Sequence, residues 1–335
     1  IMKGNYYGTI LLYKDEQAPT GCLLCHLPGA HGTFRQLPGA EIRRTGTKRR
    51  IFPAAFGPSG DLLGRGIFLP EYIFEKGKIK EHQKALKARV EKLVRPAMKL
   101  SEWEKEKYVH DFICENVHYD KLKKSYSHEI IGPLGQGVGV CEGIAKSVKV
   151  LCDALGIWCM IAICGNNPEK GIKYRHTWNI VKIGGTYYHL DATFDNTLGK
   201  HSFGAKEIRY DYFNLDDKNI FRDHEPLIAP APACTDGDHF YYKEKKMSFT
   251  KTEDVYKRSL QAAKKGKMLT FHWRGGYLTR AVLDELLDLI KKAGAEKGKV
   301  ARIALNWPQA VLRLEYVEDG QENVTMEEAN EGEQE

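Results

Sequence analysis

The sequence predicts an α+β fold, and three features carry that prediction. Apolar residues recur at helical spacing from Cys141 to Leu155, and Gly156 suits the end of that helix. Two apolar segments, 174–183 and 186–194, flank Gly184-Gly185, a pair that favours a two-residue hairpin turn. Further along, residues 239–317 alternate between strand-like and helix-like patterns, which is typical of a small α/β domain.

The residues before Cys141 predict two more helices. Residues 80–95 form a charged helical pattern that Pro96 ends. A second helix begins at Ser101, where Ser101 and Glu104 match a capping box. Residues 1–75 are rich in Gly and Pro, so we expect short strands, turns and irregular structure in the N-terminal region.

The segments after the hairpin complete the predicted organisation. Residues 157–164 predict another strand, and three prolines between 226 and 232 mark a linker. Within 239–317 the patterns predict strands near 240–243, 268–273, 301–305 and 311–317, and helices near 253–265 and 278–293. The domains expected are an N-terminal region (1–80), a central domain (81–225), a C-terminal α/β domain (239–317) and an acidic, disordered tail (318–335).

Composition limits the classes of partner. The chain has 335 residues and a net charge of +7, and no apolar run reaches the roughly 18 residues of a membrane helix. We therefore expect no membrane partner. The basic residues near Arg43–Arg50 fit a solvated loop better than a nucleic-acid site. Four of the eight cysteines lie in the apolar stretch 141–164, which favours buried thiols in a reducing, cytoplasmic setting without a signal peptide.

Cys141 is the first candidate for chemistry. It follows Gly-Gln-Gly-Val-Gly-Val and opens a helix, whose N-terminal partial positive charge favours the thiolate. A small buried residue is the alternative interpretation.

The hairpin supplies candidate partners for that thiol. With Gly184-Gly185 as the turn, Ile183 pairs with Thr186, so Trp178 falls opposite Asp191 and His176 becomes a diagonal neighbour of Asp191. Diagonal neighbours lie about 7–8 Å apart, so an imidazole and a carboxylate can meet there. A base held by a carboxylate is what a nucleophilic thiol requires.

These residues resemble the bacterial transglutaminase-like superfamily. The run GVGVCEGIAKSVKVLCDALGI matches its Cys-x-Gly-x-Ala helix, and YRHTWNIVKIGGTYYHLDATFD matches its His-x-Trp-Asn and Asp-x-Thr strands. The resemblance covers 101–196, including a lead-in at Tyr119-Asp120 and Ser127-His128, and a Tyr-Phe-x-Leu-x-Asp run at 212–217. It implies a papain-like fold, with the Cys-bearing helix packed on an antiparallel sheet, and a catalytic triad of Cys141, His176 and Asp191.

The resemblance also implies a class of reaction. We expect a cysteine peptidase or amidase that acts on a peptide or protein through an acyl-enzyme on Cys141, with no cofactor and no metal. An acyltransferase and a non-catalytic scaffold remain alternatives. Animal crosslinking enzymes carry Gln-Cys-Trp, whereas this chain has Val140-Cys141-Glu142, which disfavours glutamine crosslinking.

Several residues are candidates for supporting roles. The Cys141 backbone N–H, Gln136 and Tyr119 are candidate oxyanion donors, with Trp178 as a supporting residue. The loop from Gly165 to Lys173 could cover the site. Cys22-x-x-Cys25-His26 matches a haem-attachment pattern or half of a zinc site, but paired structural cysteines are the favoured interpretation.

Overall fold

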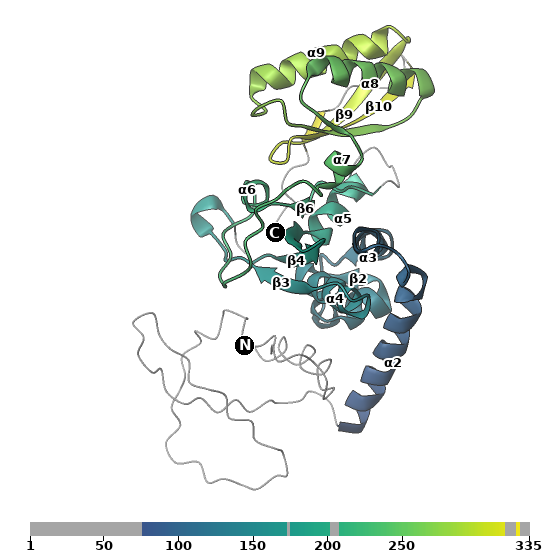
Figure 1. Ribbon diagram of the computed structural model, residues 1–335, viewed down its shortest axis with the longest axis vertical. Helices are drawn as coiled ribbons and strands as arrows, with labels where there is room; N and C mark the ends of the chain where they lie inside the picture. The colour runs from purple at the N-terminus through teal and green to yellow at the C-terminus, as the bar shows by residue number, and fades with distance from the viewer. Residues whose placement is uncertain (1–75, 173–174, 202–207, 319–325, 329–335) are drawn as a thin grey trace. The chain divides into compact units, whose positions relative to one another are not determined.

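The computed structural model describes residues 76–172, 175–201, 208–318 and 326–328 (Figure 1). The chain divides into two compact units, Ile1–Lys84 and Ala85–Glu335. The predicted strand-and-turn region, the Cys22-x-x-Cys25-His26 motif and the basic cluster lie outside the described residues. The finer domain boundaries drawn from the sequence stay predictions.

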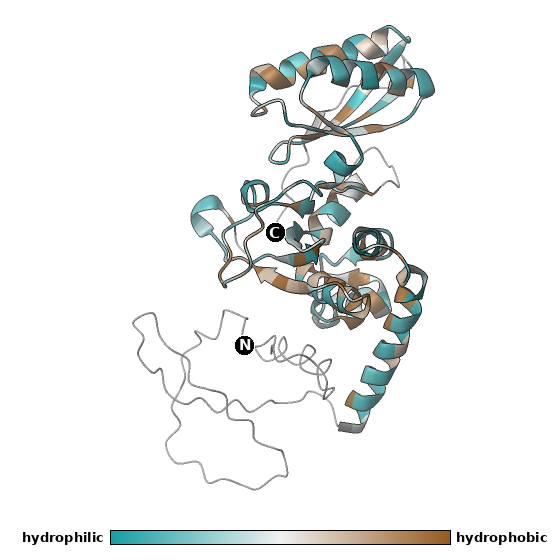
Figure 2. Ribbon diagram, viewed as in Figure 1, coloured by the Kyte–Doolittle hydropathy of each residue, from teal (hydrophilic) through white to brown (hydrophobic). Residues whose placement is uncertain are grey.

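The helices before the site form as the sequence predicts. Helix α2 spans Lys76–Val94, and Pro96 lies in the short 3-10 turn η2 (Arg95–Ala97) that follows it. Helix α3 (Glu102–Asn116) begins with the expected capping box, in which the Ser101 N–H donates to Glu104 Oε2 at 3.0 Å. Figure 2 shows α2 as largely hydrophilic, whereas strand β3 (Cys159–Ile163) is hydrophobic.

A four-stranded antiparallel sheet carries the predicted hairpin. Its strand order is β3, β4 (Thr177–Ile183), β5 (Thr186–Leu190) and β6 (Phe213–Leu215). The predicted register is confirmed, because Ile183 pairs with Thr186 and Asn179 pairs with Leu190. Helix α4 (Cys141–Ala154) packs against β3 and β4, with Ile144, Val148 and Leu151 buried.

The end of the hairpin differs from the prediction. The strand expected to continue to Phe194 stops at Leu190, and helix α5 (Ala192–His201) begins instead. The reason is Asp191, whose Oδ1 accepts hydrogen bonds from the backbone N–H groups of Thr193 and Phe194 and so starts a helix.

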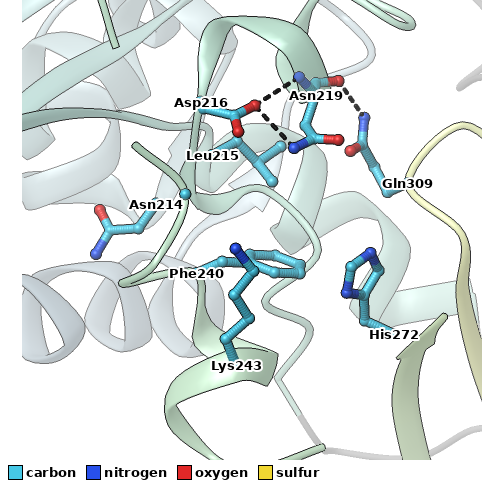
Figure 3. A pocket seen from close by; sticks show the side chains of 9 residues that line it. Asn214, Leu215, Asp216, Asn219, Phe240, Lys243, His272 and Gln309 are labelled. Carbon is cyan, nitrogen blue, oxygen red and sulfur yellow. Dashed lines mark hydrogen bonds between the residues drawn. The ribbon is translucent and has the colours of Figure 1, made fainter. Parts of the chain in front are cut away.

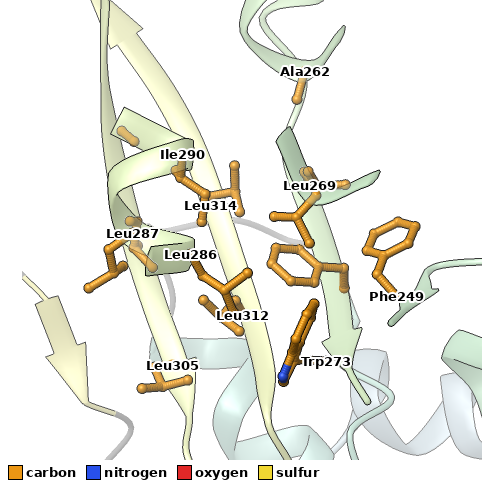
Figure 4. Packing of buried hydrophobic residues seen from close by; sticks show 14 of the residues in the cluster. Phe249, Ala262, Leu269, Trp273, Leu286, Leu287, Ile290, Leu305, Leu312 and Leu314 are labelled. Carbon is orange, nitrogen blue, oxygen red and sulfur yellow. The ribbon is translucent and has the colours of Figure 1, made fainter. Parts of the chain in front are cut away.

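The C-terminal residues form the second sheet, in the order β11 (Met326–Glu328), β9 (Lys299–Asn306), β10 (Val311–Glu318), β8 (Leu269–Trp273) and β7 (Ser248–Phe249). Helices α8 (Thr252–Lys265) and α9 (Arg280–Ala295) pack on each other and on this sheet. Figure 4 shows the apolar core between them, which includes Phe249, Leu286, Leu312 and Leu314.

One expectation for this region is wrong. Residues expected as a strand at 240–243 lie instead at a short helix, α7 (Tyr241–Glu244), because the Glu244 and Lys245 N–H groups donate to the Phe240 and Tyr241 carbonyls at 3.1 and 2.9 Å. Within the acidic tail, whose disorder stays a prediction, Met326–Glu328 form β11 and pair in parallel with β9. The α+β fold class itself is confirmed.

The described helices also bear on membrane association. None of them is long and apolar enough to cross a lipid bilayer.

Candidate active site

Cys141 is the first residue of α4, and the chain before it is tightly held. The Val140 N–H donates to Ser127 O at 3.0 Å, and a Cβ atom added at Gly143 would overlap that same carbonyl oxygen. Glycine two residues after the cysteine therefore allows the 3-10 turn η3 (Ser125–His128) to approach the start of α4. This explains the Cys-x-Gly spacing.

The beginning of α4 is open for a ligand. Its N-cap residue, Val140, places no side-chain oxygen on the first-turn N–H groups. Those groups and the helix dipole stabilise an anion, whether a thiolate or the oxyanion of a reacting carbonyl. The Cys141 backbone N–H is thus in a suitable place for the predicted oxyanion role.

The hairpin brings His176 and Asp191 together just beyond its paired residues. His176 immediately precedes β4 and Asp191 immediately follows β5. His176 Nε2 lies 2.5 Å from Asp191 Oδ2. The diagonal relation read from the sequence therefore produces a direct contact.

Asp191 is fully buried and its carboxylate accepts four hydrogen bonds. The backbone N–H groups of Thr193 and Phe194 donate to Oδ1 at 2.9 and 3.0 Å. His176 and His224 both contact Oδ2, His224 through Nε2 at 2.9 Å. Burial raises the pKa of Asp191, but the charge and hydrogen bonds of the two imidazoles lower it by more, so this pKa lies well below its ordinary value. Asp191 is therefore an anion throughout the neutral range.

The His176 ring connects Asp191 to the thiol. It hydrogen-bonds the Cys141 side chain, and with Nε2 on Asp191 the remaining nitrogen, Nδ1, is the one left to face Sγ. Burial lowers the pKa of His176, whereas Asp191 and the Cys141 thiol raise it by more, so the pKa lies well above its usual value. An imidazolium beside Cys141 is the state that favours a thiolate.

The other residues of the His-x-Trp-Asn strand fix this arrangement. The Trp178 ring stacks on His176 at a centroid distance of 5.7 Å and donates from Nε1 to His189 Nδ1 at 2.9 Å. Asn179 Nδ2 donates to the Ala145 carbonyl of α4 at 3.0 Å. The first side chain holds the imidazole plane, and the second ties β4 to the helix that carries Cys141.

The predicted oxyanion donors fall in different surroundings. Tyr119, in β1 (His118–Tyr119), pairs with Gly139 of β2 (Val138–Gly139), two residues before Cys141. Burial, Cys141 and Asp191 raise the pKa of Tyr119, so its hydroxyl stays protonated and able to donate. Gln136 ends the turn η4 (Gly132–Gln136), and within the described ranges its exposed side chain makes no hydrogen bond to the triad residues. Its role stays a prediction.

The loop after β3 is tied down rather than free. Asn167 Nδ2 and Lys170 Nζ contact the carboxylate of Glu225 at 2.9 and 2.7 Å. Glu225 follows His224, so the loop is linked to the segment that also reaches Asp191. Motion of this loop as a cover for the site remains a prediction.

The sequence reasoning missed His224 and Asp223. His224 Nδ1 lies 2.7 Å from Asp223 Oδ1, and its Nε2 contacts Asp191. The available signal was an Asp-His pair close after the 212–217 run. Nothing in its spacing relates that pair to residues 33 positions earlier.

Among the residues that the structure describes, two groups of side chains have donor atoms close enough to hold a metal ion. They are His176, Asp191 and His224, and His189, Asp217 and Cys234, with donor atoms within 4.8 Å of one another. In both groups the imidazole nitrogens already contact carboxylate oxygens, at 2.5 to 2.9 Å. Hydrogen bonding therefore accounts for these contacts.

A second cluster of the same residue types provides a comparison. Cys114 Sγ lies 3.7 Å from His110 Nε2, which lies 3.0 Å from Asp195 Oδ2. Cys114 sits in the last turn of α3, where the helix dipole opposes an anion, and burial raises the pKa of its thiol. This cluster therefore has the residue types of a catalytic triad, but its surroundings disfavour the thiolate.

Comparison with known proteins identifies a family for part of the chain. Residues 87–192 match the family model described as the transglutaminase-like superfamily. No curated protein matches the chain. One solved structure, described as a TGase, is similar at 15% identity and a TM-score of 0.30 over 41% of this chain and 36% of that one. Another, a proposed cysteine protease from Cytophaga hutchinsonii, is similar at 22% identity and a TM-score of 0.27 over 33% of this chain and 37% of that one.

These alignments differ in what they establish. The chain spans well under two thirds of either solved structure. The family match covers the start of α4 and both strands of the hairpin, and it ends one residue after Asp191. Residues 87–192 of this chain are therefore a transglutaminase-like domain.

Proposed function

We propose that this protein is a cysteine-dependent hydrolase that cleaves a peptide or amide bond. The observation that carries the proposal is the contact chain from the Cys141 thiol through the His176 ring to the buried Asp191 carboxylate. Nucleophile, base and orienting anion stand in the order that acyl transfer requires.

The proposed reaction begins with a thiolate and an imidazolium. Cys141 Sγ attacks the substrate carbonyl carbon, and the oxyanion that forms is stabilised by the Cys141 N–H and by the Tyr119 hydroxyl. His176 Nδ1 gives its proton to the leaving amine as the C–N bond breaks, which leaves a thioester on Cys141. His176 then takes a proton from water, whose oxygen attacks the thioester and releases the carboxylic acid. The thiolate and the imidazolium are restored.

Asp191 has a supporting role in this reaction. Its Oδ2 keeps the Nε2 proton on the outer side of the His176 ring, so that Nδ1 faces the thiol. The carboxylate also stabilises the imidazolium. It does not itself transfer a proton.

The fate of the thioester distinguishes hydrolysis from amine transfer. We favour water as the acceptor because Val140 and Glu142 flank Cys141 in place of the Gln and Trp of crosslinking enzymes. An amine that reached the same thioester would give an acyltransferase.

The test uses the full chain, a pool of casein peptides and a fluorescent primary amine. We expect new peptide termini, little amine incorporation, and loss of both in Cys141→Ala. The matched control is Cys114→Ala, which removes a thiol that also contacts a histidine and should leave turnover unchanged.

Three outcomes would contradict the proposal. Amine incorporation without new termini would replace hydrolysis with acyl transfer. Turnover that survives Cys141→Ala would exclude this site. A chain that neither cleaves the pool nor forms a thioester with an activated ester such as p-nitrophenyl acetate would be a non-catalytic scaffold.

A further inference from the structure

His224 lies on a hydrogen-bonded segment outside the residues that match the family model. It follows the short helix α6 (Asp217–Ile220), and its N–H donates to Ile220 O at 3.1 Å. Figure 3 shows how that helix is fixed, since Asp216 accepts from the backbone and side chain of Asn219, whose carbonyl accepts from Gln309. The backbone that carries the His224 ring is therefore held by hydrogen bonds, both within its own segment and from Gln309.

The ring is enclosed as well as anchored. The side chain of His224 has no exposed surface. It packs on Phe194 at a centroid distance of 4.6 Å and on Trp178 at 4.9 Å, and both of these rings also contact His176. Water does not compete for its nitrogens, so its hydrogen bonds have to come from the protein.

Both nitrogens of His224 face carboxylates that have other donors. Nε2 lies 2.9 Å from Asp191 Oδ2 and Nδ1 lies 2.7 Å from Asp223 Oδ1. Asp223 Oδ2 accepts from the Tyr212 hydroxyl at 2.5 Å and from Gln309 Nε2 at 3.2 Å. A neutral imidazole has one N–H, so it would direct a lone pair at one of these anions. Between two ionised carboxylates, the geometry therefore favours an imidazolium.

Burial and hydrogen bonding act in opposite directions on this ring. Burial lowers the pKa of His224, and the hydrogen bonds with Asp191 and Asp223 raise it by more. The charged or titratable groups that face His224 are Asp191, Asp223, His176, His189 and Tyr212. Those that face His176 are Asp191, Cys141, Cys164 and His224.

We propose that His224 is a positioning residue of the site: it holds Asp191 Oδ2 from a second direction and, as a buried imidazolium, shares the charge of the carboxylate that orients His176. This inference rests on the proposed function. The backbone N–H groups of Thr193 and Phe194 donate to Asp191 Oδ1, and His224 contacts Asp191 Oδ2. Together these hydrogen bonds orient Oδ2 toward His176. His224 acts through Asp191, because its side chain has no exposed surface with which to bind a substrate.

The charge of His224 affects the pKa of His176 in a direction that can be predicted. Its ring centroid lies 5.3 Å from that of His176. Two cations at this distance disfavour each other, so removal of the His224 charge raises the pKa of His176. At an effective dielectric constant of about 20, the shift is at most about two pH units.

Two variants separate position from charge. His224→Gln retains a neutral donor for Asp191, and His224→Leu retains none. We expect the His176 titration, followed by ¹⁵N chemical shifts of labelled histidine in the full chain, to move upward in both. We expect iodoacetamide alkylation of Cys141 at pH 6 to slow mainly in His224→Leu and to be rescued in His224→Gln.

The matched control is His110→Gln. His110 is also a fully buried histidine within 3.0 Å of a buried aspartate, Asp195. A merely structural loss would lower the melting temperature in this variant as well, without moving the His176 titration.

The outcomes distinguish this inference from the proposed function. The inference is overturned if the pKa of His176 in His224→Gln equals that in the wild type. This result is decisive even if His224→Leu does not fold. If Cys141 is unreactive in the wild type, the proposed function fails, while the His176 titration still reports on His224.

Discussion

Replacement of Asp191 by asparagine tests the site most directly. Asp191→Asn keeps the size of the side chain and an oxygen for the Thr193 and Phe194 N–H groups. It replaces Oδ2, which accepts from His176 and His224, by an NH₂ group. His176 Nε2 then has to present a lone pair, which places the ring proton on Nδ1. A neutral ring in that tautomer cannot take the proton of the Cys141 thiol.

The size of the effect follows from the charge that is lost. A unit charge about 4 Å away, at an effective dielectric constant of about 20, is worth about 4 kcal/mol, or about three pKa units for the imidazolium. The ring then no longer stabilises the thiolate of Cys141, so a much smaller fraction of this thiol is ionised at pH 6. Alkylation of Cys141 at pH 6 should therefore slow by about 100-fold. The kcat of any turnover should fall about 10- to 1,000-fold.

The assay is the rate of iodoacetamide modification of Cys141, followed by mass spectrometry of a digest. The control is Asp195→Asn, because Asp195 is another fully buried aspartate that contacts a histidine, His110. It should keep the wild-type rate, and His176→Ala should be at least as slow as Asp191→Asn. A wild-type rate in Asp191→Asn, with His176→Ala unreactive and circular dichroism unchanged in both, would show that Asp191 does not orient His176.

Three further predictions concern the framework of the site and of the C-terminal sheet. Burial raises the pKa of Glu106 to about 8, so the folded state holds a proton that the unfolded state releases above pH 4.5. Wild-type stability should fall by about 5 kcal/mol between pH 4.5 and 8, and urea unfolding of Glu106→Gln should lack that slope. In Gly143→Ala the new Cβ overlaps Ser127 O, so both the urea midpoint of unfolding and the rate of Cys141 alkylation should fall. Helix propensity alone would instead predict that alanine stabilises the protein by up to about 1 kcal/mol. An unchanged alkylation rate would show that the site does not need the approach of η3 to α4. Leu312→Ala leaves a cavity at a fully buried position of the C-terminal core, so the free energy of unfolding measured in urea should fall by about 2–5 kcal/mol. A fall of less than about 1 kcal/mol would show that Leu312 is not part of that core.

The sequence determined the elements whose signals are local. Gly184-Gly185 fixed the hairpin register, because a two-residue turn leaves one pairing of the strands. Ser101 and Glu104 specified the start of α3, because each satisfies a free N–H of the other. The pattern of Cys141, His176 and Asp191 could be predicted for the same reason, since one helix start and one hairpin carry all three residues.

Only the tertiary structure decided how Asp191 is held. Thr193 and Phe194 have strand propensity. The Asp191 carboxylate nevertheless accepts hydrogen bonds from their N–H groups, and the chain forms helix α5 there instead of a strand. His224 and Asp223 reach the site from a separate segment, through packing against Trp178 and Phe194. Such a contact has no periodicity and no fixed spacing in the sequence. It exists because the buried carboxylate needs partners that water cannot supply, and the fold places an imidazole there.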